Sequence, residues 1–286
     1  MTRYIPFIFV LLWSTGFVGA KFGLPYAEPF TFLMWRMTFV VPLFLLLVLI
    51  FKRPKISLFD ASIQGLVGLL IHGFYLGGVF AAISVNTPSG LSALFVSLNP
   101  IVIAIFSGLM LNTATSKREW AGLLLGLLGV IIVLYGASNW EGAITLQGIT
   151  WLSFALIGLV AGTLIQKRYA QHVDLLTGSS YQYAATLLLF TALSFSIETG
   201  NVEWNVNFML TLTWLVIALS IVSILLLLFM IRHGEAAKVA SYFYLTPPLA
   251  AFWGWLFFDE QWSWITLIGA GFIIGALIII KPAKNN

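Results

Sequence analysis

The chain has no cysteine, and only 8% of its 286 residues are charged. The lack of cysteine excludes a disulfide framework and a zinc site of the usual thiolate kind. A soluble domain carries about 25% charged residues, so this chain has too few charges to build a water-facing surface. Its surroundings are therefore expected to be lipid rather than water over most of its length.

Signals of catalysis are absent as well. The sequence contains no Walker A motif, no HExxH, no GxSxG and no cluster of carboxylates with histidines. The glycine-rich stretch at 73–78 lies in the middle of an apolar run, where a soluble phosphate-binding loop cannot form. We expect no enzyme activity, no cofactor and no metal site.

Apolar residues make up 60% of the chain and fall into long runs. A helix needs about 20 mostly apolar residues to cross a bilayer. The first run is interpreted as a retained helix, because no small-residue cleavage pattern follows it. We predict an all-α membrane protein with ten transmembrane helices at 4–23, 29–51, 62–84, 88–111, 119–136, 146–166, 175–197, 208–231, 237–257 and 262–280.

Basic residues gather in every second connection between these runs. Because basic loops face the cytoplasm, we predict a multi-pass protein of the inner (plasma) membrane with both termini cytoplasmic. Their confinement to short loops also argues against nucleic acid as a partner, despite a pI near 9.3. The cytoplasmic segments would hold twelve of the fourteen Lys and Arg, namely Arg3, Lys52, Arg53, Lys55, Lys117, Arg118, Lys167, Arg168, Arg232, Lys238, Lys281 and Lys284.

Weak internal similarity relates the two halves of the chain. A shift of 147 residues lays Asn99-Pro100 over Thr246-Pro247 and Gly122 over Gly269, and a shift of 146 lays Lys21 over Lys167. The predicted repeats are 1–140 (helices 1–5) and 141–286 (helices 6–10). Since five is an odd number, the two repeats would be inverted relative to each other, a common plan of secondary transporters.

Several short motifs recur in a fixed order along nearly the whole chain. In this order and spacing the sequence resembles the EamA type of the drug/metabolite transporter superfamily. One departure is the end of the fourth helix, Leu111-Asn112-Thr113, where the family often has a Gly-Glu pair. The resemblance rests on Trp13, Ser14, Phe17, Lys21, Pro29 and Arg36, and on residues 89–94, 98–100, 120–129, 234–236, 247–248 and 258–260.

This resemblance implies a particular arrangement and mechanism. Helices 1–4 and 6–9 would surround a central cavity, and helices 5 and 10 would pack outside it. Gly122, Gly126 and Gly129 on helix 5, with Gly269 on helix 10, would allow close packing there or form a dimer face. Transport would proceed by alternating access, with export or exchange of amino acids, metabolites or drugs.

Ionisable groups at membrane depth are costly and indicate function by default. Arg36 and Lys21 are the basic residues inside or at the end of runs, and His72 is near the middle of the third run. Arg36 or Lys21 would hold a substrate carboxylate, and His72 would add a donor or a proton site. The alternatives are structural: Arg36 capping carbonyls or pairing with Glu28, Lys21 snorkelling to headgroups, and His72 bonding a neighbouring helix.

Uncharged polar and aromatic side chains complete the predicted binding site. Pseudosymmetry pairs Arg36 with Gln182, so the charge is not repeated, and this asymmetry favours binding over structure. The deeper tryptophans would line a cavity for a flat or hydrophobic solute or, alternatively, simply pack. The predicted substrate-binding residues are Arg36, His72, Tyr75, Asn99, Trp13, Lys21, Trp151, Gln182, Tyr242 and Tyr244; Gln64, Tyr181 and Tyr183 are further polar groups at depth.

Together these features favour a secondary transporter that exports amino acids or related zwitterionic compounds. Two alternatives stay open: import or exchange of a nutrient, cofactor precursor or phosphorylated metabolite, and a membrane-embedded enzyme or receptor. The expected partners are a small-molecule substrate and the lipid bilayer, with the protein a monomer or homodimer.

Overall fold

The computed structural model describes residues 4–87, 92, 95–111, 115–137, 145–234, 236–258 and 263–280. Apart from one isolated bridge, the regular structure of these residues is helical. The ends of the chain, the start of the predicted fourth span (88–91 and 93–94), the 140/141 repeat boundary, Asn112-Thr113 and Asp259-Glu260 lie outside the described residues.

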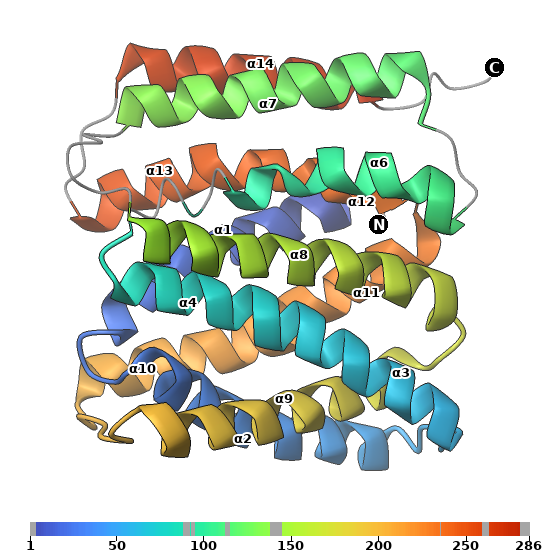
Figure 1. Cartoon of the computed structure of the whole chain (residues 1–286), viewed down its shortest axis with the longest axis vertical. Helices are drawn as coiled ribbons and strands as arrows, with labels where there is room; N and C mark the ends of the chain where they lie inside the picture. The colour runs from blue at the N-terminus through green and yellow to red at the C-terminus, as the bar shows by residue number, and fades with distance from the viewer. Residues whose placement is uncertain are drawn as a thin grey trace.

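The helices form one elongated bundle (Figure 1). In the first half they are α1 (Ile5–Gly23), α2 (Pro29–Ile50), α3 (Leu58–Gly68), η2 (Leu69–Leu76), α4 (Gly77–Ser84), α6 (Asn99–Leu111) and α7 (Lys117–Ala137). In the second half they are α8 (Leu146–Tyr169), α9 (Leu175–Ile197), α10 (Val206–Trp214), η3 (Leu215–Ser223), α11 (Ile224–His233), α12 (Ala236–Ser241), η4 (Tyr242–Leu245), α13 (Thr246–Phe258) and α14 (Trp264–Ile280).

Several helices begin where the sequence supplies a cap. The side chains of Ser57, Asp174 and Asn205 accept bonds from backbone N–H groups in the first turns of α3, α9 and α10. Such caps satisfy amides that have no partner inside the helix. Proline stands in the first turn of α1 and α2, where its missing N–H costs nothing.

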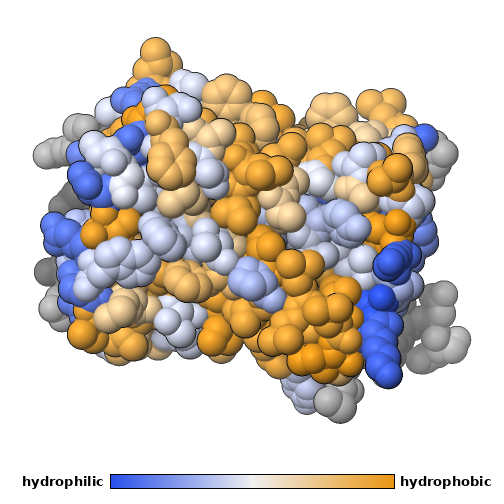
Figure 2. Space-filling model, turned by 90° about the horizontal axis from the view of Figure 1, so that it is seen from below, coloured by the Kyte–Doolittle hydropathy of each residue, from blue (hydrophilic) through white to orange (hydrophobic). Residues whose placement is uncertain are grey.

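Within the described ranges, five helical stretches are long and apolar enough to cross a membrane: Ile5–Gly23, Pro29–Ile50, Leu58–Ser84, Leu146–Tyr169 and Val206–His233. Phe95–Leu111 and Trp264–Ile280 are apolar but shorter. Figure 2 shows hydrophobic residues over much of the face below α2 and α9, with strongly hydrophilic residues near its two ends. This distribution is that of a membrane protein, since lipid rather than water would cover the apolar belt.

Two helix pairs lie at opposite extremes of the bundle's long axis (Figure 1). At one edge α7 packs along α14, and at the other α2 packs along α9. Glycines permit the α7–α14 contact: a Cβ at Gly129 would lie 2.8 Å from the carbonyl oxygen of Gly269, and one at Gly122 would lie 2.5 Å from Ile280. The two glycine-bearing helices therefore touch backbone to backbone, as expected for the predicted helices 5 and 10.

At one end of the helices, here called the acidic end, connections 24–28 and 198–205 lie together. Ala27 and Val202 pair there as an isolated antiparallel bridge. Glu198 accepts bonds from Phe30 N (2.8 Å), Thr31 N (2.6 Å) and Thr31 Oγ1 (2.8 Å), so its carboxylate caps the start of α2. The end carries the carboxylates Glu28, Glu198 and Glu203.

The other end, here called the basic end, joins connections 51–57 and 170–174. Arg53 lies 3.6 Å from Asp174, and Thr177 Oγ1 donates to the carbonyl of Pro54 (3.2 Å). Lys167 Nζ donates to the carbonyl of Ile231 (2.9 Å). The connection after α1, the first helix of the first half, thus lies at the acidic end. The connection after α8, the first helix of the second half, lies at the basic end.

Both long central stretches contain a π-helical segment at matching places. In Leu58–Ser84 it is η2, and in Val206–His233 it is η3. Their first residues, Leu69 and Leu215, are 146 positions apart, which is the shift found between the halves of the sequence. A π-helical turn widens the helix and often marks a functional site.

Candidate functional site

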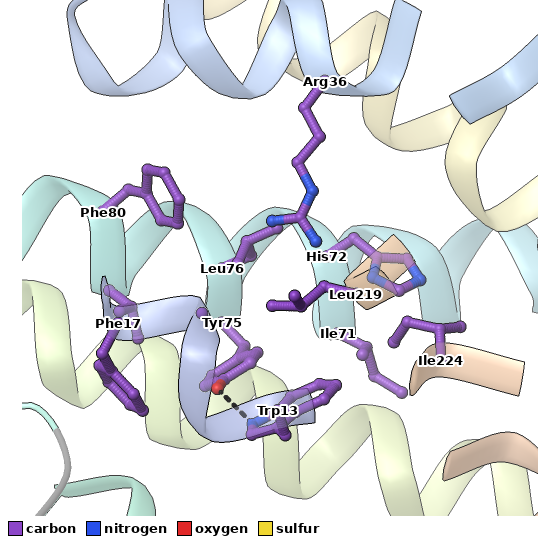
Figure 3. Close-up of a pocket in the computed structure, with 12 residues that line it drawn as sticks. Trp13, Phe17, Arg36, Ile71, His72, Tyr75, Leu76, Phe80, Leu219 and Ile224 are labelled. Carbon is purple, nitrogen blue, oxygen red and sulfur yellow. Dashed lines mark hydrogen bonds between the residues drawn. The ribbon is translucent and has the colours of Figure 1, made fainter. Parts of the chain in front are cut away.

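A small, partly open cavity lies at the centre of the bundle, between the first two helices and the two π-containing stretches (Figure 3). Its volume is about 40 Å³, which is room for a few waters at most. A metabolite therefore cannot occupy it without movement of the helices. The lining comprises Trp13, Gly16, Phe17, Arg36, Ile71, His72, Tyr75, Leu76, Val79, Phe80, Leu219 and Ile224.

Arg36 is the cationic residue of this cavity. It extends from α2 with its guanidinium beside His72 and Leu76 (Figure 3), and only 3% of the residue is exposed. Its Nε donates to Ser220 Oγ at 2.8 Å, whereas its Nη1 is buried with no hydrogen-bond partner among the described residues. A buried donor without a partner is costly, and more so on a charged group.

No described carboxylate neutralises Arg36. The alternative partner named from the sequence, Glu28, instead accepts bonds from Thr199 N (2.7 Å) and Thr199 Oγ1 (2.6 Å) at the acidic end. Buried charges in proteins are usually paired. The described carboxylates all lie at helix ends or in connections, namely Glu28, Asp60, Glu119, Asp174, Glu198 and Glu203.

A chain of contacts links Arg36 to the middle of the bundle. Ser220 accepts two hydrogen bonds. Its hydroxyl accepts from Arg36 Nε, and its backbone carbonyl accepts from the hydroxyl of Tyr183 at 2.8 Å. The Tyr183 ring stacks on His72 with centroids 4.3 Å apart and planes 13° apart. His72 Nε2 lies 3.3 Å from Gln182 Oε1, and because that oxygen can only accept, a hydrogen bond here requires a proton on Nε2.

Three glutamines continue this network toward the basic end. Gln182 Nε2 donates to Gln64 Oε1 (2.6 Å) and to Gln166 Oε1 (3.2 Å). A Cβ at Gly68 would lie 2.3 Å from the Gln182 carbonyl oxygen, so α3 and α9 touch through their backbones beside these amides. The close contact holds the amides in reach of one another.

Aromatic rings form the wall of the cavity opposite Arg36. Trp13 Nε1 donates to the Tyr75 hydroxyl at 3.1 Å (Figure 3), and the two rings stack with centroids 5.8 Å apart and planes 9° apart. Phe9 and Phe243 lie against Trp13 at 5.1 and 5.5 Å. The indole therefore has its donor and its ring contacts engaged within the protein.

The structure brings together half of the residues named from the sequence. Trp13, Arg36, His72 and Tyr75 line the cavity, and Gln182 bonds to His72 from behind it. The histidine contact matches the structural alternative for His72, a bond to a neighbouring helix, although the residue also faces the cavity.

The other named residues lie elsewhere. Lys21 lines an open hollow of about 630 Å³ at the acidic end, together with Glu28 and Glu203. Tyr244 packs against α7, where its hydroxyl donates to the Leu123 carbonyl at 2.9 Å.

Trp151, Tyr242 and Asn99 also stand apart from the cavity lining. Trp151 is edge-on to Phe30, with centroids 5.9 Å apart, and Tyr242 is half-buried in η4. Asn99, at the start of α6, is buried with neither side-chain atom hydrogen-bonded within the described part of the chain.

Two residues of the network were missed from the sequence, Ser220 and Gln166. Both occur in helices where a single small or amide side chain gives no periodic signal. Tyr183 and Gln64 were identified as polar groups at depth but not assigned to binding. Their roles depend on contacts between helices: Gln64 and Gln182 are 118 residues apart in sequence, and Tyr183 and Ser220 are 37 apart.

Known proteins resemble the chain along its full length. The model of the EamA-like transporter family matches residues 4–135 and again 146–281. The uncharacterized inner membrane transporter YedA of Escherichia coli strain K12 is 26% identical over 97% of this chain and 90% of its own. The S-adenosylmethionine/S-adenosylhomocysteine transporter of Chlamydia muridarum is 24% identical over 96% of this chain and 89% of its own.

A solved crystal structure supports the same conclusion for the fold alone. It superposes with a TM-score of 0.77, covers 98% of this chain and 96% of its own, and is 18% identical. With two family matches that span nearly all of the sequence, the chain belongs to the EamA-like transporter family and is a membrane transporter.

Proposed function

We propose that this transporter carries small metabolites that bear a carboxylate, by alternating access around the central cavity. The observation that carries the proposal is the buried guanidinium of Arg36, which has an unpartnered Nη1 and no described carboxylate to neutralise it. An oxyanion is the ligand that matches a guanidinium in charge and in geometry. Export of amino acids or related zwitterionic compounds is the form of this proposal that the sequence favours.

The proposed architecture is ten transmembrane helices in two inverted repeats, 1–140 and 141–286. Two observations support it: the π-helical segments η2 and η3 differ by the repeat shift, and equivalent connections lie at opposite ends of the bundle. The basic end would face the cytoplasm, with both termini on that side, because positive loops are retained there. A substrate site at the interface of the halves is the usual plan of such carriers.

Import or exchange of phosphorylated metabolites is the alternative, and it would require more than one cation in the cavity. The second candidate cation, Lys21, lines the open hollow at the acidic end rather than the cavity. This separation favours a singly charged anionic group over a phosphate.

The proposal is tested by replacing Arg36 and measuring ligand binding separately from folding. Purified protein is screened by thermal shift against amino acids, 2-oxo acids, sugar phosphates and nucleosides. A ligand at 100 times its Kd should stabilise the wild type by about 2.7 kcal/mol. Arg36→Gln should weaken binding of the carboxylate by about 10- to 100-fold, because a charged hydrogen bond contributes about 1.5–3 kcal/mol.

The melting temperature without ligand distinguishes this role from a structural one. Removing an unpaired buried charge should leave the ligand-free protein as stable as the wild type or more stable. Arg53→Gln, which removes a half-exposed cation from the connection that follows the same helix, is the matched control and should bind ligand normally. Unchanged affinity in Arg36→Gln, or a large loss of its ligand-free stability, would return Arg36 to a structural role.

A further inference from the structure

We infer that the preferred substrates are singly charged carboxylates without an ammonium group, such as 2-oxo acids and aryl- or alkyl-carboxylates. This inference rests on the proposed function, because it takes Arg36 as the seat of the carboxylate. It differs from the amino-acid hypothesis in one respect, the charge of the substrate as a whole.

Charge balance is the first argument. Among the described residues that line the cavity, Arg36 carries the permanent charge, and none is acidic. A monocarboxylate would bring the loaded cavity to neutrality, whereas a zwitterion would leave it at one positive charge. An uncompensated charge in a buried cavity is strongly disfavoured.

The short distance between the two charged groups of an amino acid is the second argument. The ammonium is attached to the carbon next to the carboxylate, so an amino acid bound to Arg36 would place its ammonium close to the guanidinium. The two like charges would repel each other in a medium of low dielectric constant. A carboxylate close by would relieve this repulsion, but the described ones lie at the ends of helices or between them.

Aromatic rings are the other groups that can bind an ammonium, through cation–π contact. The most electron-rich ring of the lining is Trp13, and it is in contact with Tyr75, Phe9 and Phe243. Its stacking with Tyr75, at an angle of 9°, covers one of its faces. Trp13 therefore has little ring face left for a cation, and Phe17 and Phe80 add apolar surface for the body of a substrate.

The test compares ligands that share a body and differ only in charged groups. One series is 3-phenylpropionate, phenylalanine and 2-phenylethylamine, and a smaller one is propionate, alanine and ethylamine. Each is measured by thermal shift on the full chain in detergent and by competition for uptake of radiolabelled 3-phenylpropionate into proteoliposomes. In at least one series the carboxylate should bind about tenfold or more tightly than the amino acid, and the amine should not bind.

Two further measurements connect this preference to Arg36 and to the ammonium. Raising the pH until the ammonium of the amino acid loses its proton should narrow the gap between amino acid and carboxylate. Arg36→Gln should abolish the advantage of the carboxylate in both series, while Arg53→Gln should retain it.

The outcomes separate this inference from the function on which it rests. Amino acids that bind as well as the matching carboxylates, with binding lost in Arg36→Gln, would overturn the inference and leave the proposed function standing. If carboxylates of neither series bind, or if all bind equally well to Arg36→Gln, both are overturned.

Discussion

Replacing Gly269 by alanine would place a methyl group where α7 and α14 already touch through their backbones. The added Cβ would lie 2.6 Å from the Gly129 carbonyl oxygen and 2.6 Å from the Val133 nitrogen, whereas ordinary contacts are 3.4–4 Å. Backbone atoms cannot rotate away, so the helices must move apart by about 1 Å. Overpacking of this kind costs about 1–3 kcal/mol.

The net effect is smaller because alanine also favours the helix, by about 1 kcal/mol relative to glycine. We therefore expect Gly269→Ala to lower the free energy of unfolding by at most about 2 kcal/mol, which corresponds to at most about 8 °C in melting temperature for a chain of this size. The measurement is thermal unfolding of purified protein in a mild detergent, followed by tryptophan fluorescence.

Gly271 provides a control on the same helix. A Cβ there would have no atom within 4 Å, so Gly271→Ala should be neutral or slightly stabilising. If the two variants melt at the same temperature, the backbone contact between α7 and α14 does not exist as described.

Four other variants probe the acidic end, the amide network and the basic end. Glu198→Gln should cost about 1 kcal/mol, because it removes the negative charge at the start of α2, and a melting temperature equal to wild type would contradict the cap. Thr31→Val should cost about as much, because the Thr31 hydroxyl bonds both the Glu198 carboxylate (2.8 Å) and Ser194 Oγ (2.7 Å). Gln182→Leu leaves buried amides without partners and should destabilise the protein by about 1–3 kcal/mol in the same assay, so unchanged stability would refute the network. Arg53→Ala removes a partly exposed ion pair with Asp174 and should lower the free energy of unfolding by less than about 1 kcal/mol. A much larger loss would show that solvent does not weaken this ion pair as its exposure implies.

Much of the helical pattern could be predicted from hydropathy alone. The run at 175–197 matches α9, Leu175–Ile197, and the run at 4–23 matches α1, Ile5–Gly23, within one residue. The run at 62–84 began too late: its helix starts at Leu58, because Ser57 caps a polar first turn that contains Asp60. Hydropathy reports the buried or lipid-facing part of a helix, whereas the cap determines where it begins.

The composition of the cavity was only partly predictable. Rarity of charge identified Arg36 and His72, since few such residues occur at membrane depth. The π-helical segments could not be predicted, because they depend on packing between helices and carry no residue signature. Tyr244 shows the opposite error. The sequence marks it as a polar group at membrane depth, yet its hydroxyl donates to the Leu123 carbonyl of α7.

The single bridge between Ala27 and Val202 has a practical consequence for this cysteine-free chain. Residues paired across antiparallel backbones have Cα atoms about 4.5–5.5 Å apart, within the span of about 4.4–6.8 Å that a disulfide accepts. A double-cysteine variant at these two positions would contain no other thiol, so oxidation would form one defined covalent clasp between connections 24–28 and 198–205 at the acidic end. Substrate flux that stops on oxidation and returns with a reductant would make this clasp a reversible switch for trapping one state of the carrier.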